Sequence, residues 1–344
     1  MTGGNIVELA NFSKLLSGTI PNTWIGPMNT LSTEKQTAII AALTEGCSIR
    51  AVERLTGVHR DTIMRLGARV GAGCARVHGR LMRDINVSRI EFDEIWQFVG
   101  KKRKALRETD PGTVGDQYTY IALAGSSKAI ISYYTTNKRT NEATYAFAKD
   151  VRARVLGAPE ISTDGLNAYP WAIERAFKGE CAHGVIVKHY AAGGGAGGAG
   201  DDAARRYSPG DVVSVEKQTV IGVPKYISTS YIERQNLTLR MQQRRFTRLT
   251  NGFSKKFEHH VAAIALYAMH YNFCRVHEAL KITPAMQVGV TDHVWSISEL
   301  IAAALDGTLP DGTTTENPMN LDRSDTIQST RKFSTFTVIK GGKH

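Results

Sequence analysis

Residues 88–99, SRIEFDEIWQFV, decide which fold the rest of the chain can adopt. The stretch is rich in β-branched and aromatic residues, which favour a strand. Asp93 lies at its centre, and side chains alternate along a strand, so Glu91 shares the face of Asp93 whereas Glu94 points to the opposite face. The stretch therefore predicts the first strand of a sheet, with a carboxylate in its middle.

The segments that follow predict the order of the remaining elements. Strand patterns over residues 117–124 and 129–134 are separated by the turn sequence GSSK, so the three strands would form an antiparallel meander. Next come a helix over 141–156, a strand over 159–163, a helix over 169–177 and a strand over 184–189. This order predicts a ribonuclease H-like, mixed-sheet α/β domain over residues 88–286. It would contain a flexible Gly- and Ala-rich insertion at 191–207 and be followed by a partly loose C-terminal segment, 287–344.

Residues 31–73 predict a small all-α domain ahead of the sheet. Helical patterns over 33–45, 48–56 and 59–70 are joined by short turns, a spacing that fits a helix-turn-helix. The third helix would expose side chains that reach phosphates and base edges, namely Arg60, Thr62, Arg65 and Arg69. A helical bundle without a ligand is the alternative. Residues 1–30 are expected to be flexible, and residues 74–87 to form a connector.

The composition of the 344-residue chain favours a polyanionic partner. The net charge is +11, and the basic runs lie among ordinary core-forming segments, so nucleic acid fits better than a membrane. No apolar run reaches the roughly 18–20 residues that span a bilayer, and the N-terminus does not resemble a signal peptide. The four cysteines lack C-x-x-C spacing, which favours a reducing cytoplasm over a disulfide framework or a zinc ribbon.

Residues 228–240, STSYIERQNLTLR, predict a late helix that carries one acid among many basic residues. Glu233 falls in its first turn, and Arg240 lies about two turns later on the same face. Residues 234–257 contain no acid, and the arginines Arg240, Arg244, Arg245 and Arg248 are candidate contacts to DNA phosphates. This pattern indicates a metal ligand among phosphate-binding groups. The alternative is a solvated basic face with a helix-capping glutamate.

Asp93, Asp164 and Glu233 occupy the three places where a ribonuclease H-like enzyme needs carboxylates: the first strand, the end of the fourth strand and a late helix. Such enzymes use two divalent cations, which take oxygen ligands, to act on phosphodiesters. Glu91 could replace Asp93 as a ligand. Asp150 and Glu160 compete with Asp164, although neither lies at a junction between a strand and a turn.

At these residues the chain resembles the DDE transposases of bacterial insertion sequences, in particular the IS-one family. The matching phrases are DEIWQFVGKK, STDGLNAYPWAI, STSYIERQNLTLRMQQRRFTRLTNGFSKKFEHH and HYNFCRVHEALKITPAM. The resemblance implies Asp93, Asp164 and Glu233 as the catalytic and metal-binding triad, and Arg240 as a contact to terminal DNA. It also implies two Mg²⁺ ions, replaceable by Mn²⁺, and an assembly of at least a dimer on the DNA of element ends and target.

The activity that the resemblance implies is strand cleavage at element ends followed by strand transfer into target DNA, in a bacterial cytoplasm. Many relatives carry a Cys-rich zinc finger before the helix-turn-helix, and this chain has none. Two alternatives stay open: a DNA-binding repressor with an inactive catalytic domain, and a structure-specific nuclease of the same fold.

Overall fold

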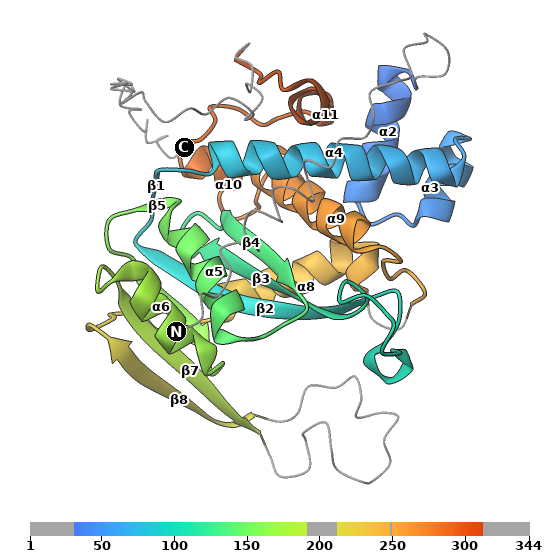
Figure 1. Ribbon diagram of the computed structural model, residues 1–344. Helices are drawn as coiled ribbons and strands as arrows, with labels where there is room; N and C mark the ends of the chain where they lie inside the picture. Colours follow the sequence, from blue (N-terminus) through green and yellow to red (C-terminus); the bar gives the residue numbers. More distant parts are fainter. Residues whose placement is uncertain (1–30, 191–211, 248–249, 312–344) are drawn as a thin grey trace, which may run out of the picture.

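A six-stranded mixed sheet lies at the centre of the computed structural model, which describes residues 31–190, 212–247 and 250–311. Its strand order is β4-β3-β2-β6-β7-β8 (Figure 1). The strands are β2 (Arg89–Val99), β3 (Gly115–Ala124), β4 (Ile130–Thr136), β6 (Glu160–Asp164), β7 (Ala182–Tyr190) and β8 (Val212–Ile221). β2, β3 and β4 form the predicted antiparallel meander, and β6 and β7 run parallel to β2. This mixed α/β arrangement is consistent with the predicted ribonuclease H-like fold.

Two short stretches differ from the sequence prediction. β8 pairs antiparallel with β7 at the edge of the sheet, where the sequence predicts no strand, and its residues are exposed along almost the whole length. The predicted helix over 141–156 ends at Arg152, because the next residues form β5 (Val155–Leu156), which pairs with β1 (Ile85–Asn86).

Helices cover both faces of the sheet (Figure 1). The bounds are α5 (Asn141–Arg152), α6 (Ala168–Phe177), α8 (Ser230–Gln242), α9 (Phe257–Met269), α10 (Pro284–Gln287) and α11 (Ile297–Asp306). On one face Phe92 of β2 packs against Phe147 of α5, with ring centroids 5.1 Å apart. On the other face Ile95 shares a buried cluster with Ile232 of α8 and Ile264 of α9. The alternation of side chains along β2 thus determines which helices each face contacts.

The three predicted N-terminal helices are present as α2 (Thr33–Thr44), α3 (Ile49–Thr56) and α4 (Arg60–Leu81). α4 is longer than predicted, because it continues unbroken through residues 74–81, which were expected to be a connector. Two glycines explain the difference. A Cβ on Gly71 would lie 2.2 Å from the backbone oxygen of Ala262, and one on Gly73 would lie 1.9 Å from that of Ala304. Glycine weakens a helix, but here it lets α9 and α11 pack directly on α4.

The hydrophobic core is continuous from these helices into the sheet domain. One buried cluster includes Ile39 of α2, Ile63 and Val70 of α4, Phe92 of β2 and Leu300 of α11. The first part of the predicted loose C-terminal segment is therefore packed, and a capping box between Ser296 and Glu299 begins its helix.

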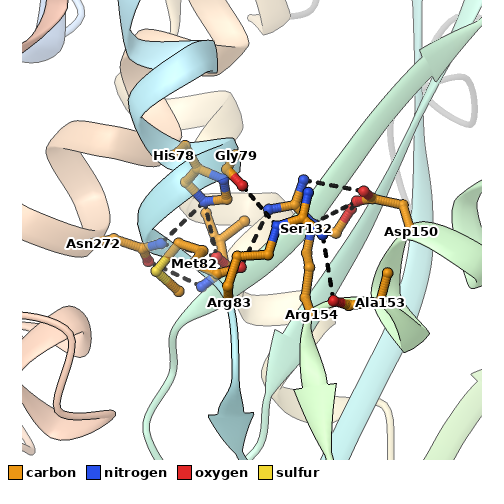
Figure 2. Close-up of polar contacts among 10 residues, drawn as sticks. His78, Gly79, Met82, Arg83, Ser132, Asp150, Ala153, Arg154 and Asn272 are labelled. Carbon is orange, nitrogen blue, oxygen red and sulfur yellow. Dashed lines mark hydrogen bonds and ion pairs between the residues drawn. The ribbon is translucent and has the colours of Figure 1, made fainter. Parts of the chain in front are cut away.

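A polar network joins the C-terminal end of α4 to the sheet and to α5 (Figure 2). The His78 ring and the Asn272 amide both lie within hydrogen-bond distance of the Ile130 carbonyl, at 3.1 and 2.8 Å. Nearby, Arg154 pairs with Asp150, and its guanidinium also donates to the Met82 carbonyl at 3.3 Å. Cys74 and His78 are both buried at this junction.

Several predictions concern segments outside the described residues: the flexible residues 1–30, the Gly- and Ala-rich insertion at 191–207, Arg248, and the part of the C-terminal segment after residue 311. Among the described residues, no helix is both long enough and apolar enough to cross a membrane.

Candidate functional site

Asp93, Asp164 and Glu233 line one open cleft with a volume of about 870 Å³. The cleft begins where β2 and β6 separate. Their ladder ends at the pair Glu91 and Ser162, so Asp93 and Asp164 each lie two residues beyond the last paired position. The register between β2 and β6 therefore places Asp93 and Asp164 at the same height along the two strands. The helix α8 contributes Glu233 to the same cleft.

Asp93 is held from two directions. Its Oδ1 accepts a hydrogen bond from the Glu94 backbone N–H at 2.9 Å, and its Oδ2 accepts one from the Asn236 amide of α8 at 2.7 Å. Burial, followed by the neighbouring carboxylates of Asp164 and Glu94, raises the pKa of Asp93 to about 7. The folded protein therefore disfavours the charged form of this side chain.

Asp164 is the last residue of β6, at the predicted junction between a strand and a turn. Its Oδ1 accepts a hydrogen bond from the Leu166 N–H at 3.1 Å, which holds the turn into α6. Burial raises its pKa as well. Two carboxyl groups with raised pKa values thus face the same cleft.

Glu233 lies in the first turn of α8, as predicted. It accepts a hydrogen bond from the Thr229 hydroxyl at 2.6 Å and forms an ion pair with Lys188 of β7. Its carboxylate does not belong to the tightest acidic group in the described part of the chain. In that group, oxygens of Asp93, Glu94 and Asp164 all lie within 4.8 Å of one another.

Glu91 and Glu94 have different roles from those that the sequence suggested. Glu91 shares the face of Asp93, but its Oε2 accepts the backbone N–H groups of Tyr231 and Ile232, both at 2.9 Å. It therefore caps the start of α8, where a carboxylate favours the helix dipole. Glu94 starts from the opposite face, yet it reaches the acidic group because β6 no longer covers β2 at this level.

The competing carboxylates Asp150 and Glu160 lie outside the residues that line the cleft. Asp150 accepts hydrogen bonds from Arg154 and Ser132 in the network of Figure 2. Glu160 accepts a hydrogen bond from the Tyr226 N–H. The cleft thus distinguishes Asp164 from its competitors.

Two basic residues that the sequence analysis missed line the cleft beside the acids. Lys188 of β7 contacts Glu233, and Arg139, which follows β4, pairs with Glu94. No motif spacing relates these residues to the acids, because each comes from a different element. The sequence does offer one signal that Lys188 lies near the acids: it belongs to the predicted strand that follows the one ending at Asp164, and the two strands are neighbours in the sheet.

The donor set of the cleft fits a divalent cation. Hard cations such as Mg²⁺ prefer carboxylate oxygens, and three such groups converge here without enough positive charge to keep their pKa values low. A bound cation would stabilise the charged forms that burial disfavours.

The predicted DNA contacts are divided between two regions. In α4, Arg60, Arg65 and Arg69 are exposed, and Arg65 donates to the Thr62 hydroxyl at 3.4 Å. In the second region, Arg240 in the last turn of α8 is partly buried, as is Arg245 after the helix, whereas Arg244 is exposed. The Arg245 guanidinium donates to the Ser254 hydroxyl at 3.2 Å, and burial lowers its pKa. Arg245 therefore has a structural contact that the sequence did not indicate.

Comparisons with known proteins give weak similarities. No protein-family model matches the sequence, and no curated protein matches it. Among solved structures, a chain of the piggyBac transposase synaptic complex with hairpin DNA is 10% identical, with a TM-score of 0.32 over 85% of this chain and 74% of that chain. A chain of the Mos1 strand transfer complex is 11% identical, with a TM-score of 0.21 over 78% and 87%. At these TM-scores neither superposition assigns an activity to this chain.

Proposed function

We propose that this protein is a DDE transposase that cleaves DNA strands at the ends of an insertion sequence and transfers them into target DNA. The observation that supports this function best is the convergence of Asp93, Asp164 and Glu233 on one open cleft with two basic side chains. An acidic centre flanked by cations suits a phosphodiester, because the acids hold metal and the cations attract phosphate.

In this proposal Asp93 and Asp164 hold divalent cations, and Glu233 completes the set. Two Mg²⁺ ions, or Mn²⁺ ions in their place, would supply Lewis-acid stabilisation of the phosphate oxygens and a water of lowered pKa. Glu94 is a fourth carboxylate within reach of the same group.

The surrounding side chains position this set. Asn236 orients the carboxylate of Asp93, and Thr229 orients that of Glu233. Lys188 and Arg139 both line the cleft and would contact DNA phosphates once the acids bind metal. Exposed arginines of α4 would bind element ends in a helix-turn-helix arrangement, and pairing two ends requires at least a dimer.

The test is nicking of a supercoiled plasmid that carries the element's own ends, with Mg²⁺, Mn²⁺ or EDTA. We expect metal-dependent nicks at the ends, and a loss of at least about 100-fold in Glu233→Gln and Asp93→Asn. Losing a metal ligand removes electrostatic stabilisation of the transition state, and even a single hydrogen-bond donor that stabilises transition-state charge typically contributes a factor of 10²–10³. Both variants should still bind DNA. Glu160→Gln, a carboxylate outside the cleft, is the matched control and should cut at the normal rate.

Each other outcome has a definite meaning. Binding to the ends without cutting under either metal would indicate the repressor. Cutting that ignores the ends and never joins strands would indicate the structure-specific nuclease. Full activity in Glu233→Gln would contradict the proposed site.

A further inference from the structure

A row of aromatic side chains lies along the outer half of β2, beyond Glu94. We call Tyr118, Trp96, Phe98 and Phe253 the aromatic strip. Tyr118 of β3 lies directly opposite Trp96 in the strand register. The ring centroids of Trp96 and Phe98 are 6.1 Å apart, and those of Phe98 and Phe253 are 4.5 Å apart. Three of the rings therefore lie in a row, with Tyr118 beside Trp96 on the neighbouring strand; Trp96 is exposed and the other three residues are partly buried.

The strip is connected to the proposed active site through Arg139. This arginine lines the cleft, pairs with Glu94 and lies over the Tyr118 ring, with its guanidinium carbon 5.4 Å from the ring centroid. Trp96 is two residues from Glu94 on the same strand, which corresponds to about 7 Å along the chain and places both side chains on the same face of β2. Because the Glu94 side chain reaches the acidic group, a strand of DNA that enters the cleft could continue past Glu94 and Arg139 onto the strip.

The strip is accessible because β2 extends beyond β6. The ladder between these strands ends at Glu91, and Trp96 is 38% exposed. An aromatic cluster on a sheet is more often part of a core. Here the tryptophan is at the surface, as are two lysines that contact the other rings.

The charges around the strip favour a polyanion over an apolar protein partner. Lys102 Nζ lies 5.7 Å from the Phe98 centroid, and Lys255 Nζ lies 3.2 Å from the Phe253 centroid. An apolar partner would have to bury these charges, which is costly. A nucleic acid strand instead offers bases that stack on aromatic rings and phosphates that pair with lysines.

We propose that the aromatic strip binds unpaired nucleotides of a DNA strand beside the cleft, with bases stacked on Trp96 and its neighbours and phosphates paired with Lys102 and Lys255. The inference rests on the proposed function in one respect, namely that this strand is the one being cut. The binding itself needs neither metal nor cleavage.

The test measures the affinity of the full chain for a short single-stranded oligonucleotide and for the matching duplex, in EDTA, by fluorescence anisotropy. Stacking of one base on an aromatic side chain typically contributes about 5-fold or more to affinity. We expect Trp96→Ala to weaken single-strand binding by at least that factor and duplex binding by less than about 2-fold. Trp96→Phe keeps a ring and should remain within about 3-fold of wild type.

Trp171→Ala is the matched control. Trp171 of α6 is 37% exposed and also has a cation over its ring, with the Arg175 guanidinium carbon 5.0 Å from the centroid, but it lies outside the strip. We expect no change in this variant. Equal single-strand affinity in Trp96→Ala and Trp171→Ala would overturn the proposal, as would equal losses for single strand and duplex.

Photocrosslinking of the wild-type protein to an oligonucleotide that contains 5-iododeoxyuridine avoids any effect of substitution on folding. Crosslinks in peptides that contain Trp96, Phe98 or Phe253 would support the strip, and crosslinks confined to other peptides would overturn it. Because both measurements omit metal, they are independent of the nicking assay. If Glu233→Gln cuts normally while Trp96→Ala loses single-strand binding, the proposed active site fails and the strip stands.

Discussion

At the scale of single residues, the acids of the cleft are oriented by hydrogen bonds from neighbours outside the proposed set of metal ligands. Asn236 is the clearest case, because its amide is a buried donor from α8 directed at Asp93, whose pKa is already raised to about 7. Removing that donor disfavours the charged carboxylate further. It also leaves the side chain free to change its orientation.

We therefore expect Asn236→Ala to weaken Mn²⁺ binding by about 10- to 100-fold, the range typical when a hydrogen bond to a metal ligand is lost. Isothermal titration calorimetry of the protein without DNA measures this directly. Asn137→Ala is the control, since Asn137 is an exposed residue whose amide donates to the Gly112 carbonyl away from the acids. Unchanged Mn²⁺ affinity in Asn236→Ala would mean that Asp93 needs no such support.

At the scale of elements, α4 links the N-terminal helices to the domain that carries the cleft. It does so with glycines in its interior, at the points where α9 and α11 cross it. The same helix contains Gly79, where a Cβ would meet nothing within 4 Å. The two kinds of glycine allow packing and helix propensity to be separated within one element.

Gly73→Ala should lower the free energy of unfolding by at least about 2 kcal/mol, because the new methyl group would overlap the Ala304 backbone and α11 must move. Gly79→Ala should instead raise it by about 0.5–1 kcal/mol, the usual gain from alanine in a helix interior. Urea denaturation measures both. Equal effects of the two substitutions would show that the close contact of α4 with α11 does not limit stability.

At the scale of the whole molecule, the sequence predicts the features that local residue patterns determine. It does not predict the features that depend on contacts between distant segments. The strands of the meander and the positions of Asp93, Asp164 and Glu233 follow from residue types and element order. The length of α4 does not, because its glycines favour a connector until α9 and α11 are packed on them. The sequence also does not predict that Lys188 and Arg139 lie beside the acids, because only the folded sheet brings β7 and the segment after β4 to the same cleft.

Burial lowers the pKa of four buried histidines, His78, His183, His260 and His270, which makes the stability of the whole molecule depend on pH. Burial lowers the pKa of His78 and of His260 to about 3 and that of His183 to about 4. The unfolded chain protonates each ring near pH 6.5, whereas the folded protein keeps it neutral until far lower pH. Their contribution to stability is therefore complete above pH 6.5 and is lost as the pH falls toward the folded pKa values.

At pH 5.5 each of His78, His183 and His260 should cost on the order of 1 kcal/mol relative to neutral pH, or a few kcal/mol for the three together. That sum is a large share of the stability of an ordinary domain. Urea denaturation at pH 7.5 and pH 5.5 checks it, in Asp93→Asn with EDTA, because the raised pKa of Asp93 contributes with the opposite sign. Replacing His183 by Gln in that background should reduce the loss between the two pH values by on the order of 1 kcal/mol. An unchanged loss would mean that the His183 ring is protonated in the folded protein.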